Sequence, residues 1–413
     1  MFESLVVLLS TGLISSAPEE ASSLSWMDST VETDKHATLK LASRRYARDL
    51  EDESGIWLVG VTHIGDGSFY NAVEELVQDS DLVLYESVMP RVTMTIPAGV
   101  SNEKRREVTQ EAVDWLAQAI GSVSSMDTPP IESIEQLQVA IQLHDRRLVD
   151  AVRNLRTDAW GNPMVLNRNG NLTSVTSHGA DGFAGGEGDA GDIVATVDLG
   201  VPVFAAEGIQ ESLATGLKLE FQLAVLPYER DDWVVCDMSW EDLKARFAET
   251  NVDLEGLSGM LEGSSLPAGI AKLFLRLLPA MDLMTGGGVT DGIKVLLVEL
   301  LGREESVNVA IRELGEGTGR ILIDERNQVV IDQLQDHLTE GYELVSVVYG
   351  AGHMQDLGQR LEQLGYVPVE TRWLPAISVD LENSSLSRSH LRMLRQSVNM
   401  AMMQMNQRAS QQR

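Results

Sequence analysis

Short apolar segments alternate with amphipathic ones in two parts of the chain. In the first part, IWLVGVTH (56–63) and DLVLYES (81–87) are apolar enough for buried strands, and SFYNAVEELVQDS between them has apolar residues at helical spacing. Near the end, NQVVIDQLQDHLTEG predicts a helix, YELVSVVYG a strand, MQDLGQRLEQLG a helix and YVPVETRWLPA a final strand. Because strand–helix–strand crossovers are right-handed and cover both faces of a sheet, we expect an α/β fold with a mainly parallel central sheet and flanking helices.

Other segments depart from this pattern. Residues 18–54 are polar and favour an exposed lead-in. The segment from Arg156 to Asp192 is rich in Gly, Asn, Asp and Ser, and it starts as a hairpin with Asn169-Gly170 at the turn, followed by a glycine-acid loop. After Ser384 the chain is basic, and an apolar stripe at spacings of three and four predicts a C-terminal helix that either docks on the core or forms a homo-oligomer contact.

These patterns divide the chain into six parts. They are a signal peptide at 1–17, a polar lead-in at 18–54, the first part of the α/β core at 55–145, a small β- and loop-rich insertion at 146–195, the second part of the core at 196–380, and the basic C-terminal helix at 381–413.

The N-terminal segment resembles a secretory signal. An apolar run from Leu5 to Ile14 is followed by small residues suited to cleavage, although Glu3 stands where a basic residue is usual. We therefore expect export to the periplasm or the cell exterior, with a cytoplasmic location as the alternative. No later segment reaches about 18 uninterrupted apolar residues, so no transmembrane segment is expected in the mature chain.

Composition narrows the classes of partner and site. The chain has 413 residues, 43% of them hydrophobic, which is enough for a large core. It has 32 Lys and Arg against 62 Asp and Glu, and a net charge of −30 argues against nucleic acid or anionic lipid as the main partner. Its one cysteine, Cys236, excludes an internal disulfide and a cysteine zinc cluster.

Two glycine-x-x-histidine turns follow predicted strands. His63 comes three residues after Gly60, and His353 comes three residues after Gly350, so both leave the carboxyl end of a strand. A glycine there permits backbone dihedrals and a close approach that a side chain would block. Glu86 holds the analogous place after DLVLY. Since ligands of open parallel sheets bind at this edge, we expect the three side chains to converge.

Two imidazoles and a carboxylate are the ligand set of many hydrolytic metal centres. A divalent transition metal such as Mn, Co or Zn, bound by His63, His353 and Glu86, could polarise a carbonyl and lower the pKa of bound water from about 15.7 towards about 7. Glu86 is then either a ligand or, just outside the ligand shell, the general base. Taken singly, each histidine is also consistent with an ordinary loop residue.

The two turns, the glutamate and the ending GAGHM…L…GY resemble the TraB/GumN family, which is similar to the Tiki-type metalloproteases. The resemblance covers about half of the chain and is most specific at 56–91 and 342–373. It implies that His63, His353 and Glu86 bind a divalent metal and cleave peptide bonds. Arg91, in ESVMPR, matches a recurrent arginine of the family and is assigned to a substrate carboxylate or an oxyanion, or to a surface salt bridge.

The glycine-acid segment resembles a different family. TDAWGNP followed by SHGADGFAGGEGDAGDI resembles the C-terminal region of the type II secretion major pseudopilin, where the loop holds calcium. Ca²⁺ takes roughly six to eight oxygen ligands, which carboxylates and glycine-turned carbonyls supply. Asp181 and Asp192 match the acidic ligands of that family, with Asp189 as a third. A flexible acidic loop without an ion is the alternative.

The sequence therefore predicts a bacterial metal-dependent hydrolase, most simply a metalloprotease that acts on a peptide or protein. Two alternatives stay open. One is a binding protein of the same fold that holds haem or a peptide without turnover, and the other, suggested by the insertion alone, is an accessory of a secretion system.

Overall fold

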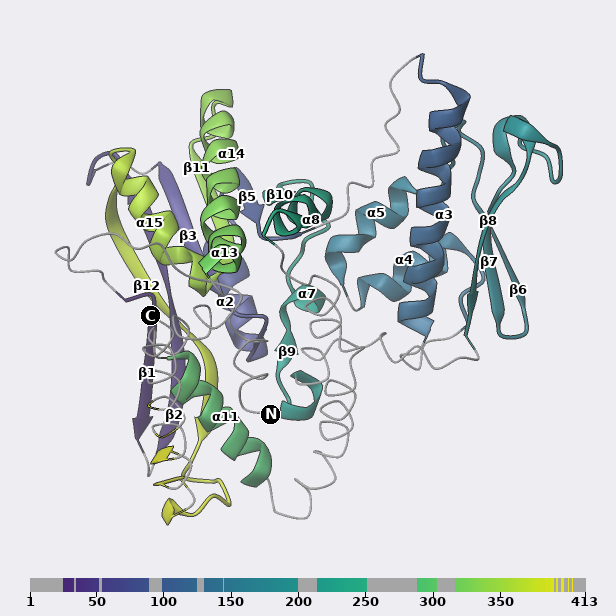
Figure 1. Ribbon diagram of the computed structural model, residues 1–413. Coiled ribbons are helices and arrows are strands. Elements are labelled where there is room, and N and C mark those ends of the chain that lie inside the picture. Colours follow the sequence, from purple (N-terminus) through teal and green to yellow (C-terminus); the bar gives the residue numbers. More distant parts are fainter. Residues whose placement is uncertain are drawn as a thin grey trace. The chain divides into compact units, whose positions relative to one another are not determined.

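The computed structural model describes most of the chain in two compact units (Figure 1). The described residues are 25–32, 35–51, 54–88, 99–124, 130–143, 145–199, 214–250, 288–302 and 316–389, with 391, 392, 395, 396, 400 and 403. The first unit contains the described residues up to 88 and from 214 onward, and the second contains 99–199. The predicted signal peptide and Arg91 lie outside the described residues.

The first unit is built on a seven-stranded sheet. Its strands are β1 (Met27–Glu32), β2 (His36–Ala47), β3 (Gly55–Val61), β5 (Leu82–Tyr85), β10 (Trp233–Val235), β11 (Leu344–Gly350) and β12 (Val367–Asp380). The order is β1-β2-β3-β11-β5-β10, with β12 also paired to β2. The strands β3, β11, β5 and β10 run parallel, whereas β1 and β12 are antiparallel to β2, and β2 to β3. The prediction of an α/β fold with a mostly parallel central sheet is confirmed.

Helices cover this sheet, and two-residue strands lie beside it. The remaining elements of the unit are β4 (Ile64–Gly65), β9 (Glu220–Phe221), α2 (Gly67–Val77), α7 (Gln222–Val225), α8 (Trp240–Ala248), α11 (Gly288–Leu301), α13 (Glu316–Gly319), the π-helical η4 (Arg320–Glu325), α14 (Arg326–Glu340), the 3₁₀ turn η5 (Ala351–His353) and α15 (Met354–Gln363). The helices predicted at 68–80, 327–341 and 354–365 are confirmed as α2, α14 and α15.

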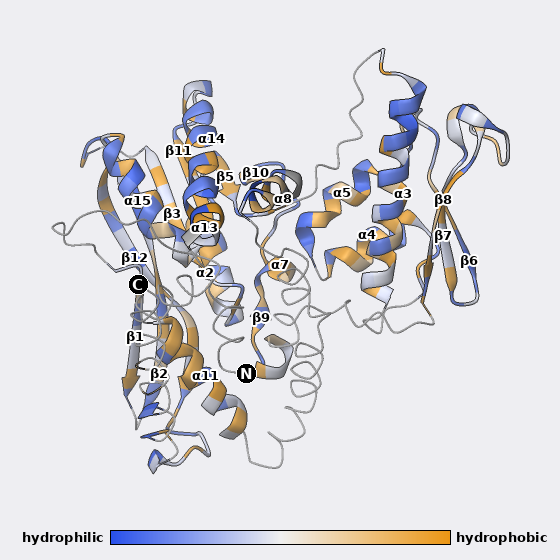
Figure 2. Cartoon of the chain, in the orientation of Figure 1, coloured by the Kyte–Doolittle hydropathy of each residue, from blue (hydrophilic) through white to orange (hydrophobic). Residues whose placement is uncertain are grey.

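The core follows the pleat of the central strands. On β11, Val345, Val347 and Tyr349 point to a cluster that includes Val330 of α14 and Leu357 of α15. The alternate residues of the strand face the other way, as the two-residue period requires. Because both faces are covered, β11 and its neighbour β3 are almost continuously hydrophobic (Figure 2). This burial fixes the register, and with it the level at which each strand ends.

The segment expected to be an exposed lead-in belongs to the sheet. β1 and β2 pair with each other, and β2 also pairs with β3 and β12. In HATLKLASRRYA the side chains of Ala37, Leu39 and Leu41 are buried, while Thr38 and Lys40 between them are half-buried. The expectation was wrong for this part because polar residues at alternate positions lower the mean hydropathy of a strand that buries one face.

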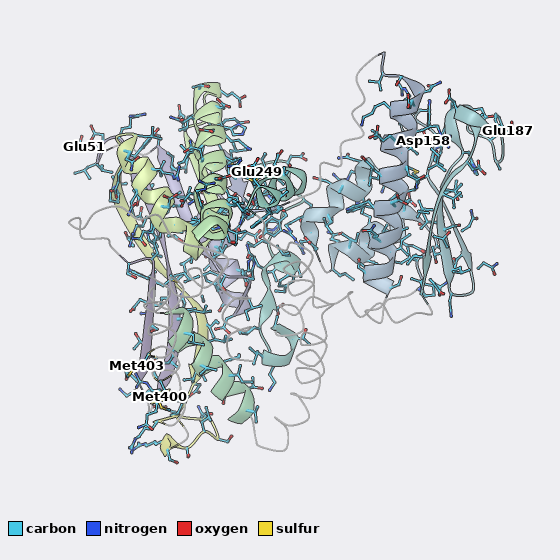
Figure 3. All side chains as sticks on the ribbon, in the orientation of Figure 1. Glu51, Asp158, Glu187, Glu249, Met400 and Met403 are labelled. Atoms are coloured by element: carbon cyan, nitrogen blue, oxygen red, sulfur yellow. The ribbon has the colours of Figure 1, made fainter. Side chains whose placement is uncertain are left out.

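The C-terminal segment contacts the same unit. Leu391 is buried, Arg395 Nε lies 2.6 Å from Glu299 Oε1 on α11, and Ser384 Oγ donates to Asp291 Oδ2 at 2.6 Å. Met400 and Met403 are exposed (Figure 3). The burial of Leu391 and the ion pair of Arg395 with α11 support docking on the core, the first of the two expectations for this segment.

The second unit has a hydrophobic core of its own. Its elements are α3 (Asn102–Ser124), α4 (Ile134–Gln142), η1 (Arg146–Leu148), α5 (Val149–Asn154), β6 (Val165–Asn169), β7 (Leu172–Ser177), η2 (Gly179–Asp181), η3 (Gly188–Ala190) and β8 (Ile193–Asp198). Leu116 of α3, Leu137 of α4 and Val152 of α5 pack with Val175 and Ile193 of the antiparallel sheet. The predicted insertion, 146–195, therefore shares its core with the two helices that precede it.

The predicted hairpin is confirmed, with a shift of its turn. Asn169 pairs with Leu172, so the two central residues are Gly170 and Asn171 rather than Asn169 and Gly170. Gly170 has φ +62°, whereas no described non-glycine residue except Lys218 has a positive φ. A glycine at the first central position is typical of a type II′ turn.

Asp158 joins the turn TDAWGNP to the strand that precedes the glycine-acid loop. Its carboxylate is buried and accepts hydrogen bonds from Trp160 N and Asn162 N, both at 2.9 Å, and from Ser177 Oγ at 2.6 Å. Figure 3 labels Asp158 in this unit. The turn TDAWGNP and the end of β7 are thus held by one carboxylate.

We expect Asp158→Ala to lower the free energy of unfolding of this unit by about 2–3 kcal/mol, because buried donors lose a charged acceptor. Native-state hydrogen exchange at the amides of β7 measures the loss. Asp114→Ala is the matched control, since Asp114 is exposed on α3 and accepts a hydrogen bond from Gln110 Nε2 at 3.0 Å. Equal effects of the two substitutions would contradict the prediction.

Among the helices that the structure describes, none combines the length and the hydrophobicity needed to cross a bilayer.

Candidate functional site

Polar residues follow the four parallel strands at one edge of the sheet. The registers Val61–Gly350, Val348–Tyr85 and Val235–Tyr85 place the ends of β3, β11, β5 and β10 at nearly the same level. The residues delivered there are His63 after β3, His353 after β11, Glu86 after β5 and Asp237 after β10. The carboxyl edge therefore carries two imidazoles and two carboxylates from segments far apart in the chain.

The two glycine-x-x-histidine turns have different local structures. After β3, Gly60 is needed for close approach, because a Cβ there would lie 3.0 Å from Ala42 O and 3.4 Å from Met354 Cγ. After β11 the chain enters the 3₁₀ turn that ends at His353 and continues as α15, and Gly350 has φ −49°. Neither glycine adopts a left-handed dihedral, so the expected use of glycine's dihedral freedom was wrong and close packing explains Gly60.

Glu86 and His353 are in contact. His353 Nε2 lies 3.5 Å from Glu86 Oε1, and the side chains are 0% and 11% exposed. His353 Nδ1 lies 2.6 Å from Asn327 Oδ1, whereas Nε2 is buried and has no hydrogen-bond partner within the described part of the chain. His63 lies close enough to lower the pKa of Glu86. The structure thus brings the predicted residues Glu86 and His353 together and places His63 within electrostatic range.

A buried arginine binds the same carboxylate. Arg326 Nη2 donates to Glu86 Oε1 at 2.7 Å, and its Nε and Nη2 donate to Asp237 at 2.9 and 2.6 Å. Arg326 is 4% exposed and Asp237 0%. Gly350 N donates to Glu86 Oε2 at 2.7 Å. Two carboxylates share one guanidinium, so each has a positive partner in a place where an isolated ion would be costly, and the group keeps one excess negative charge.

This environment sets the charge of both groups. Burial raises the pKa of Glu86, but Arg326, the two imidazoles and the Gly350 N–H outweigh it and lower the pKa to about 2. Burial is the largest cause that lowers the pKa of His353, to about 4, although Glu86 opposes the shift. At neutral pH the pair is therefore a carboxylate beside an uncharged imidazole.

Both shifts make the folded unit less stable in acid. Above pH 4.5 the contribution of Glu86 is complete, and it is lost as the pH falls from its ordinary pKa of 4.5 to about 2. His353 also destabilises the folded unit as the pH falls from 6.5 to about 4, because the unfolded chain takes up a proton there that the folded chain does not. We expect the free energy of unfolding to decrease as the pH is lowered, by up to about 1.4 kcal/mol per pH unit for each group.

Urea unfolding at a series of pH values measures this dependence. His353→Asn should remove the part between pH 6.5 and 4, because the asparagine amide can still donate to Asn327 but does not titrate. The same slope in wild type and His353→Asn would contradict the assignment to His353.

The sequence did not point to Arg326, Asn327 or Asp237. Asp237 could have been found, since WVVCD ends an apolar run with an acid just as DLVLYE does. Arg326 and Asn327 carry no comparable signal, because they begin α14 within an ordinary amphipathic pattern. The π-helical turn η4 just before them is a local feature often found at functional sites.

The expected three-ligand metal centre is not assembled in this structure. Among the described residues, no group of three or more His, Cys, Asp or Glu side chains is arranged to hold a metal ion. The donor pair His353 Nε2 and Glu86 Oε1 has suitable chemistry, but a third ligand is not in place. Glu86 Oε1 has already accepted one bond from Arg326, which leaves it one lone pair for a further partner.

The acids of the glycine-acid loop each bind a different protein group. The bonds are Phe183 N to Asp181 Oδ1 at 3.1 Å, Asn102 Nδ2 to Asp189 Oδ2 at 2.7 Å, His178 Nδ1 with Asp192 Oδ1 at 3.0 Å, and Gly185 N to Asp192 Oδ2 at 3.1 Å. Arg106 Nη1 donates to Gly188 O and Gly191 O at 2.8 and 2.9 Å. Among the described residues, no three acids are arranged to hold one ion, so two acids with carbonyl oxygens are the set to test.

Comparison of the chain with family models, with curated proteins and with solved structures gave no match. The resemblances to the TraB/GumN family and to the major pseudopilin therefore stay predictions.

Proposed function

We propose that this chain is a hydrolase that acts on a peptide or protein at the carboxyl edge of β3, β11 and β5, with a divalent transition metal ion. The observation that carries the proposal is the pair formed by His353 Nε2 and Glu86 Oε1, which are 3.5 Å apart. Perturbed titratable groups that face each other at a strand edge are typical of active sites.

His353 Nε2 and Glu86 Oε1 would select the same kind of ligand. An uncharged imidazole nitrogen and an ionised carboxylate both accept hydrogen bonds, so a group that lies against both must carry hydrogen or positive charge. A water molecule meets this demand, and Glu86 is the base that would take its proton. Arg326 keeps Glu86 ionised, and Gly350 N–H fixes its second oxygen.

The metal is part of the proposal on chemical grounds. His353 Nε2 and the nearby imidazole of His63 would hold it, and Glu86 would then act as the base rather than as a ligand. When bound, such an ion supplies a Lewis acid for a carbonyl and lowers the pKa of water. The chain's own residues bind and orient the substrate and move the proton, with Glu86 as acceptor.

Turnover of a peptide library by the full-length protein tests the proposal. Metal-free protein is assayed alone and with Mn²⁺, Co²⁺ or Zn²⁺, and cleavage is followed by mass spectrometry. Metal-dependent cleavage that is lost in His63→Ala and in His353→Asn supports the proposal. His337→Ala is the control, since His337 pairs with Glu340 on the exposed side of α14. Stoichiometric binding of a peptide or haem without cleavage would instead make this a binding protein.

We also propose that the glycine-acid loop binds Ca²⁺ through Asp181 and Asp192 with backbone carbonyls. Five of its glycines have positive φ, a backbone conformation that lets a short loop turn tightly: Gly179, Gly182, Gly185, Gly186 and Gly188. Calcium at about 100 times its dissociation constant would then stabilise the unit by about 2.7 kcal/mol.

Melting curves with and without Ca²⁺ test the loop proposal. The double variant Asp181→Ala, Asp192→Ala should lose the calcium-dependent rise in melting temperature, and Asp114→Ala should keep it. A calcium response that is the same in the double variant and the wild type would remove this proposal.

A further inference from the structure

A buried row of polar side chains runs from His353 towards the surface. Asn327 Oδ1 lies 2.6 Å from His353 Nδ1, and Asn327 Nδ2 donates to Asp356 Oδ2 at 2.8 Å. Arg360 Nε donates to the same Asp356 oxygen at 2.6 Å. Asn327 and His353 are 0% exposed and Asp356 is 7% exposed. Apart from His353, no member of this row was suggested by the sequence patterns.

The surroundings determine which way the Asn327 amide points. Its Nδ2 faces two acceptors, the Asp356 carboxylate and the carbonyl oxygen of His353 at 3.3 Å. A flipped amide would turn its oxygen towards both acceptors and lose both bonds, and a buried amide without partners is costly. Arg360 in turn donates to Asp356, which holds the carboxylate in place as the acceptor for Asn327 Nδ2.

The amide orientation then decides the tautomer of His353. Because Asn327 Oδ1 can only accept, the proton of the uncharged ring must be on Nδ1. Nε2 is left with its lone pair, directed at the edge where Glu86 lies. The opposite tautomer would put a lone pair against Asn327 Oδ1 and a proton on Nε2, where Glu86 would accept it.

We propose that Asn327 is a positioning residue that holds His353 in the Nδ1–H tautomer, so that Nε2 faces Glu86 as an acceptor. That Nδ1 carries a proton follows from the geometry, whereas the use of Nε2 for binding metal or substrate rests on the proposed function. Bonds to the far nitrogen of a reactive histidine commonly set its tautomer in this way. Asn327 touches no reacting atom in this arrangement and acts through His353.

Nitrogen NMR of full-length protein labelled with ¹⁵N-histidine tests the proposal at neutral pH. His353→Asn identifies the His353 signals. We expect the wild type to show a protonated Nδ1 and an unprotonated Nε2. Asn327→Leu, similar in size but unable to accept, should shift the ring to the Nε2–H tautomer, drawn by Glu86. Asn327→Asp keeps an acceptor at Nδ1 and should keep Nδ1 protonated, although its second oxygen then faces Asp356 and the His353 carbonyl.

A role in packing alone would leave the tautomer unchanged in Asn327→Leu, and that result would overturn the proposal. An Nε2–H tautomer in the wild type would overturn it as well, and this measurement needs no variant that folds poorly. The NMR result is independent of turnover, so a failure of the hydrolase proposal is seen separately. If turnover is found, Asn327→Leu should lower it, or the metal affinity, about 10- to 100-fold and Asn327→Asp less.

Discussion

Glu86→Gln is expected to lower the turnover number of the proposed hydrolase roughly 100- to 10,000-fold, the range usual for loss of a general base. The side chain keeps its size, but the amide cannot take a proton at neutral pH. It also has one acceptor oxygen in place of two, so it loses either the Arg326 bond or the Gly350 N–H bond. Initial rates at saturating substrate measure the effect.

Glu340→Gln is the matched control for this substitution. Glu340 also lies beside a histidine, with Oε2 3.0 Å from His337 Nδ1, but the pair is on the surface of α14. Turnover should be unchanged in this variant. If Glu86→Gln keeps wild-type turnover while its melting curve shows a folded protein, Glu86 is not the base and the proposed mechanism is wrong.

Arg326→Met is expected to cost about 3–5 kcal/mol of folding free energy, the usual result when one partner of a buried ion pair is removed. Asp237 and Glu86 would then face each other without a positive charge, and Asp237 is 0% exposed. Hydrogen exchange at the amides of β11 measures the loss in the unit that contains the site.

Two further variants separate this effect from a general effect of losing an arginine. Arg230→Met removes a pair with Asp232 whose side chains are 44% and 32% exposed, and should cost at most about 1 kcal/mol. Adding Asp237→Asn to Arg326→Met removes one uncompensated carboxylate and should recover part of the loss. Equal costs for Arg326→Met and Arg230→Met would show that the network contributes no more than a surface pair.

Local patterns predicted the repeating elements of the first unit well. The strands β3, β5 and β11 and the helices α2, α14 and α15 have strong periodicity because each buries one stripe or both faces. Where burial alternates with polar residues, as in β2, the signal was too weak to be recognised. The direction of β12 was also missed, since hydrophobic spacing carries no information on which strand is its neighbour.

The candidate site was predictable only in part, from the rule that ligands of open parallel sheets bind at the carboxyl ends of the strands. That rule placed His63, Glu86 and His353 at one edge, and the contact between Glu86 and His353 agrees with it. Arg326 lies 240 residues from Glu86 in the chain, and Asn327 lies 26 residues from His353. Their contacts arise from the docking of α14 on the sheet, and a short stretch of sequence does not indicate how a helix docks.

The sequence by itself determined most of the central strands and helices of the first unit, because hydrophobic spacing and backbone propensity act over a few residues. It also determined that two imidazoles and a carboxylate follow strands that end at one edge. Only the tertiary structure decided which nitrogen of His353 faces Glu86 and which arginine neutralises it. Those properties depend on hydrogen bonds and ion pairs whose strength falls off within a few ångströms, between groups that packing alone brings together.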